Sequence, residues 1–399
     1  MDDQKSQRPW PAQWENATLR DSETEAPVSG PHAESLTLSS VWSFPDLEAA
    51  DRVQSPEAGG FLYRRDGHPN ARSLSARLAR AHTAAEYVLT AQGMSALAAV
   101  ALALLRPGNH VWLSRDLYGK TRAMFTEGLG AWNLFSRTFD PSSPEDLQRL
   151  AAGPADLVVV ETISNPRVRV TDLQRMAELT HKAGGLLLVD NTFATHLLVR
   201  PLELGADLCM ESLTKIVAGH SDSMLGMVCG RDAVVMKKIA AATSLYGLTS
   251  SPLDCYLTSR GLATLPLRLQ AACANALALA RCMAEQASVA AVDYPGLSTH
   301  PQHALARGQL TAFGWMLCIE LSGGRQSVQR AIERLAPEVP FCPSLGDVQT
   351  TVSHPVSTSH RGLTREQQLE LGISDGSLRI SCGAEPTEWL CEKFVSALG

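Results

Sequence analysis

The sequence has no basic tract, few aromatic residues and no apolar run long enough to cross a bilayer. Its 399 residues carry 35 Lys and Arg against 41 Asp and Glu, and aromatic residues make up 6% of the chain. Because no segment concentrates positive charge, nucleic acid and anionic membranes are not expected partners. The longest largely apolar stretch runs from Met94 to Leu105, which is too short for a membrane span and suits a buried helix.

The sequence also lacks the marks of a secreted or metal-dependent protein. Its first ten residues, MDDQKSQRPW, begin with acids and contain no apolar segment, so we expect no signal peptide. All nine cysteines lie from Cys209 onward without a CxxC pair, which disfavours a disulfide framework or a zinc knuckle. The eleven histidines show no HExxH spacing, so no metal is expected. These features predict a cytoplasmic enzyme with free thiols.

Between about residues 71 and 230 the chain alternates helical and strand-like segments. EYVLT, NHVWLS, DLVVVE and LLLVD are typical of strands, and GMSALAAVALALL, SPEDLQRLAA and TDLQRMAELTHKAGG are typical of helices, the last with Thr171 as its expected N-cap. The alternation predicts an α/β fold with a mostly parallel sheet covered on both faces. Ligands of such sheets bind where the strands end, which places Thr90–Ser95, Glu161–Asn165 and Asp190–Phe193 on one rim.

The regions on either side of this alternation differ from it. Residues 1–58 show neither the periodicity of a helix nor that of a strand. They nevertheless contain Trp10, Trp14, Trp42 and Phe44, so we expect an extended arm that contacts a neighbouring subunit. A long helical stretch at about 252–286 is followed by strand-like FGWMLCIEL and SLRISC. We therefore expect a large ligand-binding domain at 59–255 and a smaller α+β domain at 256–399.

Two residues indicate the chemistry. Asp190 ends an apolar strand, so its carboxylate could pair with a protonated ring nitrogen, although a VDNT segment also fits a helix N-cap or a turn. Lys215 follows Ser212 and Thr214, which suits a Schiff-base lysine with hydroxyl groups placed for a phosphate. Burial and a nearby cation would lower the pKa of its amine, as imine formation requires. A surface lysine in a loop is the alternative.

A third signal lies at Gly93 and Met94, which follow a strand and open a helix. Their amides would point at an anion with the helix dipole assisting, although a simple strand-to-helix turn is the alternative. A phosphate at a helix start, a ring nitrogen held by Asp190 and an imine on Lys215 are together the needs of pyridoxal 5′-phosphate.

Several short motifs follow one another in a fixed order. They are YRRDGHPN (63–70), QGM (92–94), YGKT (118–121), ETISNP (161–166), DNTF (190–193), SLTK (212–215) with GHSD (219–222), SLG (344–346) and LRISCG (378–383). In these motifs and their order the sequence, from about residue 59 onward, resembles the Cys/Met-metabolism family of pyridoxal-phosphate enzymes. This family includes cystathionine γ-synthase, cystathionine γ-lyase and methionine γ-lyase.

The resemblance implies a fold and a role for each matching residue. The fold would be the fold-type I pyridoxal-phosphate transferase fold, with a mostly parallel seven-stranded sheet. Lys215, covalently bound to the cofactor, would be catalytic with Tyr118 and Asp190. The cofactor would also contact Gly93, Met94, Asn165, Thr192, Ser212 and Thr214, together with Tyr63 and Arg65 from a neighbouring subunit. Ser344 and Arg379 would bind the amino-acid substrate, Arg379 through its α-carboxylate. Family members are commonly tetramers built from such dimers.

Five positions depart from the family pattern: His68, Asn70, Gln92, Lys120 and Pro343. Lys120 stands where methionine γ-lyases typically carry Cys, and Pro343 where members that handle cystathionine often carry Glu. The expected activity is γ-elimination or γ-replacement on a sulfur amino acid or an activated homoserine, of the cystathionine γ-lyase or γ-synthase type. O-acylhomoserine sulfhydrylase, methionine γ-lyase and cystathionine β-lyase remain alternatives, as does a cofactor-binding protein without turnover.

Overall fold

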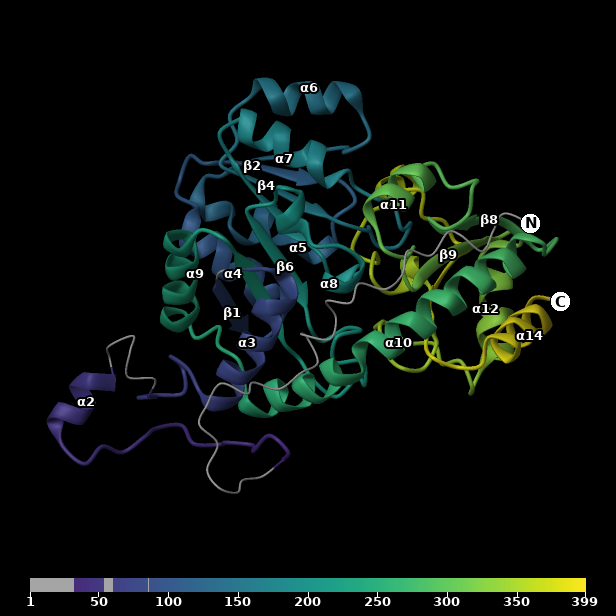
Figure 1. The fold of residues 1–399 in the computed structure, drawn as a ribbon. Helices are drawn as coiled ribbons and strands as arrows, with labels where there is room; N and C mark the ends of the chain where they lie inside the picture. The colour runs from purple at the N-terminus through teal and green to yellow at the C-terminus, as the bar shows by residue number, and fades with distance from the viewer. Residues whose placement is uncertain (1–31, 54–59, 85) are drawn as a thin grey trace.

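A seven-stranded sheet in the order β1-β7-β6-β5-β4-β2-β3 organises the first half of the chain (Figure 1). The computed structural model describes residues 32–53, 60–84 and 86–399. The strands are β1 (Glu86–Thr90), β2 (His110–Ser114), β3 (Phe135–Phe139), β4 (Leu157–Glu161), β5 (Leu186–Asp190), β6 (Leu208–Ser212) and β7 (Gly226–Gly230). Only β7 runs antiparallel to its neighbours, so the predicted mostly parallel sheet is confirmed.

Helices cover both faces of this sheet, because the strands are apolar on both sides. In β4, for example, Val158 and Val160 belong to one buried cluster while Leu157 and Val159 belong to the other. One face packs against α3 (Pro69–His82), α6 (Pro144–Ala152), α7 (Leu173–Lys182), α8 (Thr195–Leu198) and η3 (Pro201–Leu204). The other packs against α4 (Gly93–Leu104), η1 (Met124–Gly128), η2 (Gly130–Trp132) and α9 (Ala233–Leu245).

A smaller antiparallel sheet, in the order β10-β11-β9-β8, forms the core of the second lobe. Its strands are β8 (Val289–Asp293), β9 (Met316–Leu321), β10 (Thr351–Ser353) and β11 (Ser377–Ser381). The helices and turns of this part are α11 (His303–Gln309), α12 (Gly324–Leu335), η4 (Pro355–Ser357), α13 (Arg365–Glu370) and α14 (Thr387–Leu398). The predicted α+β character of this region is confirmed, while the domain limits at 58 and 255 stay predictions.

The long helix α10 (Pro252–Ala284) links the two lobes. Its first half packs in the core of the large sheet through Leu262, Leu265 and Leu269, and its second half packs in the small lobe through Leu279 and Met283. By length and composition α10 could cross a membrane, but 56% of its most apolar window is buried inside the protein, as in a core helix.

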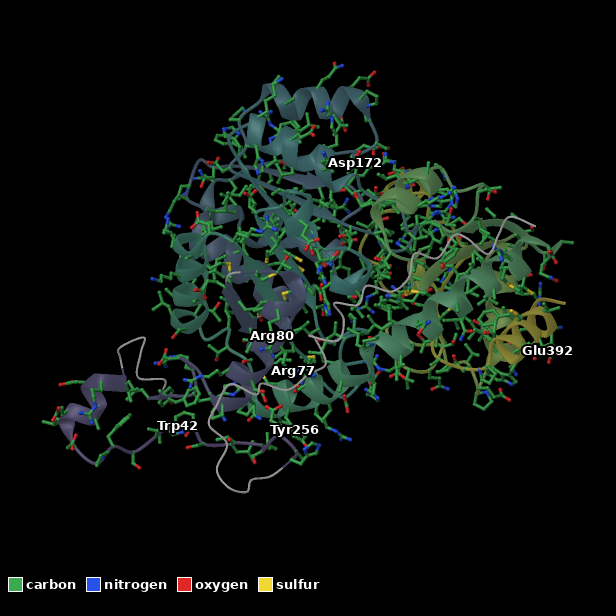
Figure 2. All side chains as sticks on the ribbon, viewed as in Figure 1. Trp42, Arg77, Arg80, Asp172, Tyr256 and Glu392 are labelled. Carbon is green, nitrogen blue, oxygen red and sulfur yellow. The ribbon has the colours of Figure 1, made fainter. Side chains whose placement is uncertain are left out.

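An arm extends from the body at the N-terminal side (Figures 1 and 2). It comprises α2 (Leu47–Val53) and extended segments joined by an isolated bridge between Val41 and Tyr63. The Trp42 and Phe61 rings lie 5.2 Å apart within it. Residues 1–31 and 54–59, including Trp10 and Trp14, lie outside the described residues, so the prediction that they belong to an arm stays untested.

One local prediction is wrong. The N-cap of α7 is Asp172, labelled in Figure 2, whose carboxylate accepts from the Arg175 amide at 2.9 Å. Thr171 lies one residue too early, because its amide is already bonded to the Thr162 carbonyl. Asp172, one residue later, is at the helix start, and its side chain reaches a free amide of the first turn.

Candidate active site

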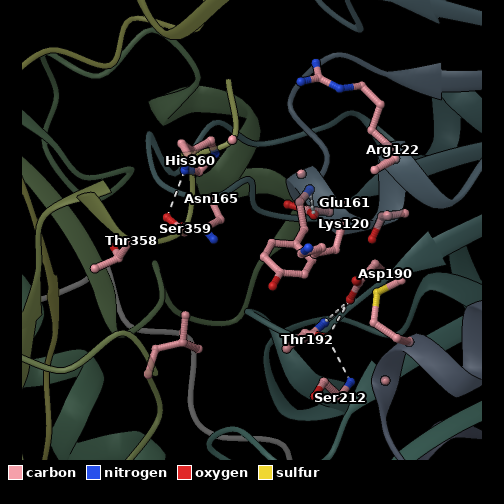
Figure 3. A pocket seen from close by; sticks show the side chains of 18 of the residues that line it. Lys120, Arg122, Glu161, Asn165, Asp190, Thr192, Ser212, Thr358, Ser359 and His360 are labelled. Carbon is pink, nitrogen blue, oxygen red and sulfur yellow. Dashed lines mark hydrogen bonds between the residues drawn. The ribbon is translucent and has the colours of Figure 1, made fainter. Parts of the chain in front are cut away.

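A cavity of about 1210 Å³ lies where the large sheet meets the second lobe (Figure 3). The ends of three neighbouring strands and the start of α4 form one wall, and residues 341–345 and 357–363 form another. Ten of the predicted site residues line it: Gly93, Met94, Tyr118, Asn165, Asp190, Thr192, Ser212, Thr214, Lys215 and Arg379. The rim predicted from the strand ends is thus a real edge of this cavity.

Lys215 occupies a tight turn that follows β6. Its backbone amide donates to the Ser212 carbonyl at 3.2 Å, and its side-chain Nζ donates to the Ser344 hydroxyl at 3.3 Å. Burial is the main cause that lowers the pKa of this amine, and the Arg379 guanidinium lowers it further. A lysine of this kind is more readily neutral and hence nucleophilic than an exposed one.

Asp190 stands at the end of β5, where two donors from one residue hold it. Both the amide and the hydroxyl of Thr192 donate to Asp190 Oδ1, at 3.0 and 2.5 Å. The Thr192 hydroxyl in turn accepts from the Ser212 amide at 2.9 Å (Figure 3). Burial raises the pKa of Asp190, and the bonds from Thr192 oppose that shift. The carboxylate is therefore oriented and poised to pair with a cationic partner in the cavity.

The start of α4 forms a cradle beside Ser212. A Cβ added at Gly93 would lie 2.9 Å from the Ser212 Cβ, so no other residue could keep this approach. The N-cap Gln92 makes no side-chain bond to the first amides of the helix, which leaves them for an anion. The Thr214 hydroxyl, by contrast, already donates to the Leu225 carbonyl and accepts from its amide. A phosphate therefore finds its donors at the α4 amides and Ser212, with Thr214 engaged elsewhere in this structure.

Arg379 on β11 is almost wholly buried, with 1% of its side chain exposed. Its Nη1 donates to Asn165 Oδ1 at 3.0 Å and its Nη2 to the Ser344 carbonyl at 3.0 Å. Its Nε has no partner among the described residues. Burial lowers the pKa of this guanidinium to about 10, so it stays charged at neutral pH. Arg379 lines the cavity, so its positive charge suits the carboxylate of a substrate.

The structure does not bring Tyr63 and Arg65 into the cavity of their own chain. Both lie on the arm, where the Arg65 guanidinium stacks on the Tyr63 ring at 5.0 Å, and 44% of Tyr63 is exposed. They line a separate depression of about 570 Å³ under the arm. Their predicted role in the site of a neighbouring subunit stays a prediction.

From the sequence, Glu161 has a place on the rim but no assigned role, and no signal points to His360 at all. Glu161 is buried at the end of β4 and accepts from the Tyr118 amide at 2.7 Å, which fixes the position of that tyrosine. Burial and then the nearby Asp190 raise the pKa of Glu161 well above its usual value. His360 enters from the second lobe, and burial followed by Arg379 and Arg122 lowers its pKa to about 4. A single His in an irregular loop gives no pattern from which to find it.

Comparison with known proteins matches this geometry to one family. The profile of the family described as "Cys/Met metabolism PLP-dependent enzyme" matches residues 16–399. This chain belongs to that family. It is 36% identical to O-succinylhomoserine sulfhydrylase of Pseudomonas aeruginosa over 94% of this chain and 92% of that protein, and 35% identical to L-methionine gamma-lyase of Pseudomonas putida over 90% of each. The solved cystathionine gamma synthase of Xanthomonas oryzae superposes with a TM-score of 0.91 at 36% identity, covering 98% of both chains.

Membership confirms three expectations from the sequence: the pyridoxal-phosphate fold, the cofactor itself, and carbon–sulfur lyase or transferase chemistry of the transsulfuration type. The residues present fit the group. The cradle at Gly93 suits its phosphate, Asp190 suits its ring nitrogen, and the Lys215 amine suits its aldehyde carbon. The individual roles of these residues stay predictions that the geometry supports.

Proposed function

We propose that this protein catalyses γ-replacement on a homoserine ester whose leaving group carries a carboxylate, with a thiol taking its place. The observation that carries this proposal is a set of three cations, Lys120, Arg122 and Arg361, which line the cavity. None of them has an ion-pair partner anywhere in the part of the chain that the structure describes. Cations left unpaired around a cavity favour an anionic ligand.

The positive field reaches into the cavity, since Arg122 is one of the causes that lower the pKa of His360. A dicarboxylic acyl group on the homoserine oxygen would place its free carboxylate among these cations. The methylthio group of methionine carries no charge for them to bind. The distal end of cystathionine carries an ammonium as well as a carboxylate, and Pro343, which also lines this wall, offers no acid to that ammonium. The names of the sulfhydrylase and synthase relatives agree with this choice.

Other residues of the cavity would act at the reacting carbons of the substrate. Pyridoxal 5′-phosphate, when bound, supplies an electron sink for charge released at the substrate carbons. Arg379 would hold the α-carboxylate through its positive charge, and Asp190 would stabilise positive charge on the ring. The Lys215 Nζ, with its lowered pKa, takes the Cα proton and can return it to the carbon skeleton. Tyr118, fixed through Glu161, is placed to donate a proton or to accept one from the substrate ammonium.

We further infer that the enzyme acts in the cytoplasm as a dimer that shares its sites, with a tetramer formed from two dimers. The projecting arm carries Tyr63 and Arg65 away from their own cavity, which leaves them available to a neighbour. All nine cysteines are free thiols, as suits a reducing compartment.

The proposal is tested by comparing O-succinylhomoserine with O-acetylhomoserine as substrates, with cysteine or sulfide as the thiol. The succinyl ester should be preferred by about 10-fold or more in kcat/KM, because a charged hydrogen bond contributes about 1.5–3 kcal/mol. Arg122→Gln should remove most of that preference and leave the acetyl ester within about 3-fold of its original rate.

Lys182→Gln is the matched control, because it removes an exposed cation at the end of α7 outside the cavity. It should leave the preference unchanged. Equal use of both esters by the unmodified enzyme would contradict the proposal, as would an unchanged preference in Arg122→Gln.

A further inference from the structure

A second group of reactive side chains lies outside the cavity, on the opposite face of the large sheet. Glu211 precedes Ser212 on β6, so its side chain points away from the cofactor edge. His82 from the end of α3 and His196 from α8 meet it there. The side chains of His82 and Glu211 are each 1% exposed, and His196 is 3% exposed. Three elements distant in sequence thus bring two imidazoles and a carboxylate together in the core.

Most of the polar atoms in this cluster have no partner. Both ring nitrogens of His82, both of His196 and the Oε2 of Glu211 lack a hydrogen bond among the described residues. The Oε1 of Glu211 accepts from the Asn191 amide nitrogen at 3.1 Å. A buried polar atom without a hydrogen bond lowers the stability of the folded state by about 1–3 kcal/mol. Five such atoms in one place therefore indicate a ligand that would bind several of them.

The donor atoms have the identity and spacing that a transition metal requires. Those of His82, His196 and Glu211 all lie within 4.8 Å of one another, and His82 has the same relation to the thiols of Cys209 and Cys229. A tetrahedral ion with bonds of about 2.1 Å separates its ligands by about 3.4 Å. The distance from His82 Nε2 to Glu211 Oε1 is already 3.5 Å. Two imidazole donors favour zinc over magnesium and calcium, which prefer oxygen ligands.

We propose that His82, His196 and Glu211 bind one divalent ion of the zinc type. The site is structural, since no position is open to solvent, and it ties α3 and α8 to the sheet behind the cofactor edge. Binding would release any proton on the Glu211 carboxyl group, because the carboxylate is the form that ligates a metal. The sequence showed no such site because its ligands come from separate elements and have no motif spacing.

A cation near the cluster is partly neutralised. Arg200 pairs with Glu203 at 3.3 Å, which offsets part of its charge close to the proposed site. The competing explanation is a proton shared between Glu211 and His82.

The test measures the metal content of the tag-free holoenzyme, grown with zinc and passed through chelator-treated buffer, by inductively coupled plasma mass spectrometry. About one zinc per chain is expected for the unmodified protein. Glu211→Gln and His196→Asn should each reduce this to about a tenth or less while the bound cofactor stays near one per chain. His181→Asn, at a surface ion pair with Asp207, should keep the zinc.

A second measurement uses only the unmodified protein, so it remains informative if the variants do not fold. Removal of the ion from the unmodified holoenzyme by a strong chelator should lower its melting temperature by several degrees, and added zinc should restore it. Unmodified protein with less than about a tenth of an equivalent of zinc, and no change of melting temperature with zinc or chelator, would overturn the proposal and favour the shared proton. Neither readout depends on the choice of substrate.

Discussion

The amine of Lys215 donates to the hydroxyl of Ser344 at 3.3 Å, although 129 residues separate them in the chain. The lysine belongs to the turn after β6, and the serine lies on the segment that approaches from the second lobe. The same segment offers its Ser344 carbonyl to Arg379, so one short stretch positions both the amine and the substrate-binding cation. The reacting centre thus depends on how the two lobes meet.

Replacement of Lys215 by Ala should abolish turnover and the visible absorbance of the covalently attached cofactor. The substitution removes the cavity amine whose pKa is lowered by burial and by Arg379, as imine formation requires. Phosphate affinity should persist, because the α4 amides and Ser212 are unchanged. Absorbance spectroscopy and an assay for the released acid check both effects. A variant that keeps either the absorbance or the turnover would refute the assignment of Lys215.

Gly93→Ala should weaken cofactor binding by about 10-fold or more, because the new Cβ would press on Ser212 and shift the start of α4. Titration of the apoenzyme with pyridoxal 5′-phosphate, followed by fluorescence, gives the dissociation constant. Gly308→Ala is the matched control, since a Cβ there meets nothing within 4 Å. If both variants bound the cofactor as the unmodified enzyme does, the cradle would not be the phosphate site.

His360→Gln should change how stability depends on pH. The folded state keeps His360 neutral, with its pKa lowered to about 4, whereas the unfolded chain protonates it near pH 6.5. Protonation therefore favours the unfolded state of the unmodified protein as pH falls from 6.5 to 4, and glutamine removes this effect. The stability of the unmodified protein relative to the variant should fall by about 3 kcal/mol over that range.

Urea unfolding at fixed protein and cofactor concentrations measures the two free energies. Between pH 7 and pH 8 their difference should change by less than about 0.3 kcal/mol, since the histidine is largely neutral in both states there. A difference that is also constant from pH 7 down to pH 4 would show that His360 is not held neutral by the fold.

Much of this fold was predictable because its signals are local. β4 and β5 are short apolar runs whose last residues, Glu161 and Asp190, mark the ligand edge. β3, with the sequence FSRTF, was harder to predict. It is an edge strand whose residues are largely exposed, so it lacks the apolar run that marks the central strands. The site residues that motifs could reveal lie on the large sheet, whereas His360 reaches the cavity only through tertiary packing. The unpaired state of Arg122 is likewise a property of the folded chain.

The arm predicts complementation between two inactive variants. Arg65→Ala should impair cofactor binding in the neighbour's site, and Lys215→Ala should inactivate its own. A mixed dimer contains one chain of each variant. One of its sites then has both the native Lys215 and the native Arg65 of the neighbour, and the other site lacks both. Co-refolding equal amounts should restore about a quarter of the unmodified activity, since about half of the dimers are mixed and each has one intact site. Activity no higher than that of the separate variants would place Arg65 in its own chain's site or outside any site.

The central claim is that a carboxylate-bearing group leaves the γ-carbon and a thiol replaces it. The most direct measurement follows purified, cofactor-loaded enzyme with O-succinylhomoserine and cysteine, and quantifies succinate, thioether product and 2-oxobutyrate together. The account predicts that succinate and thioether appear in equal amounts, with little 2-oxobutyrate while cysteine is present. Release of 2-oxobutyrate as the main product with cysteine present, or faster release of it from cystathionine or methionine, would contradict the account.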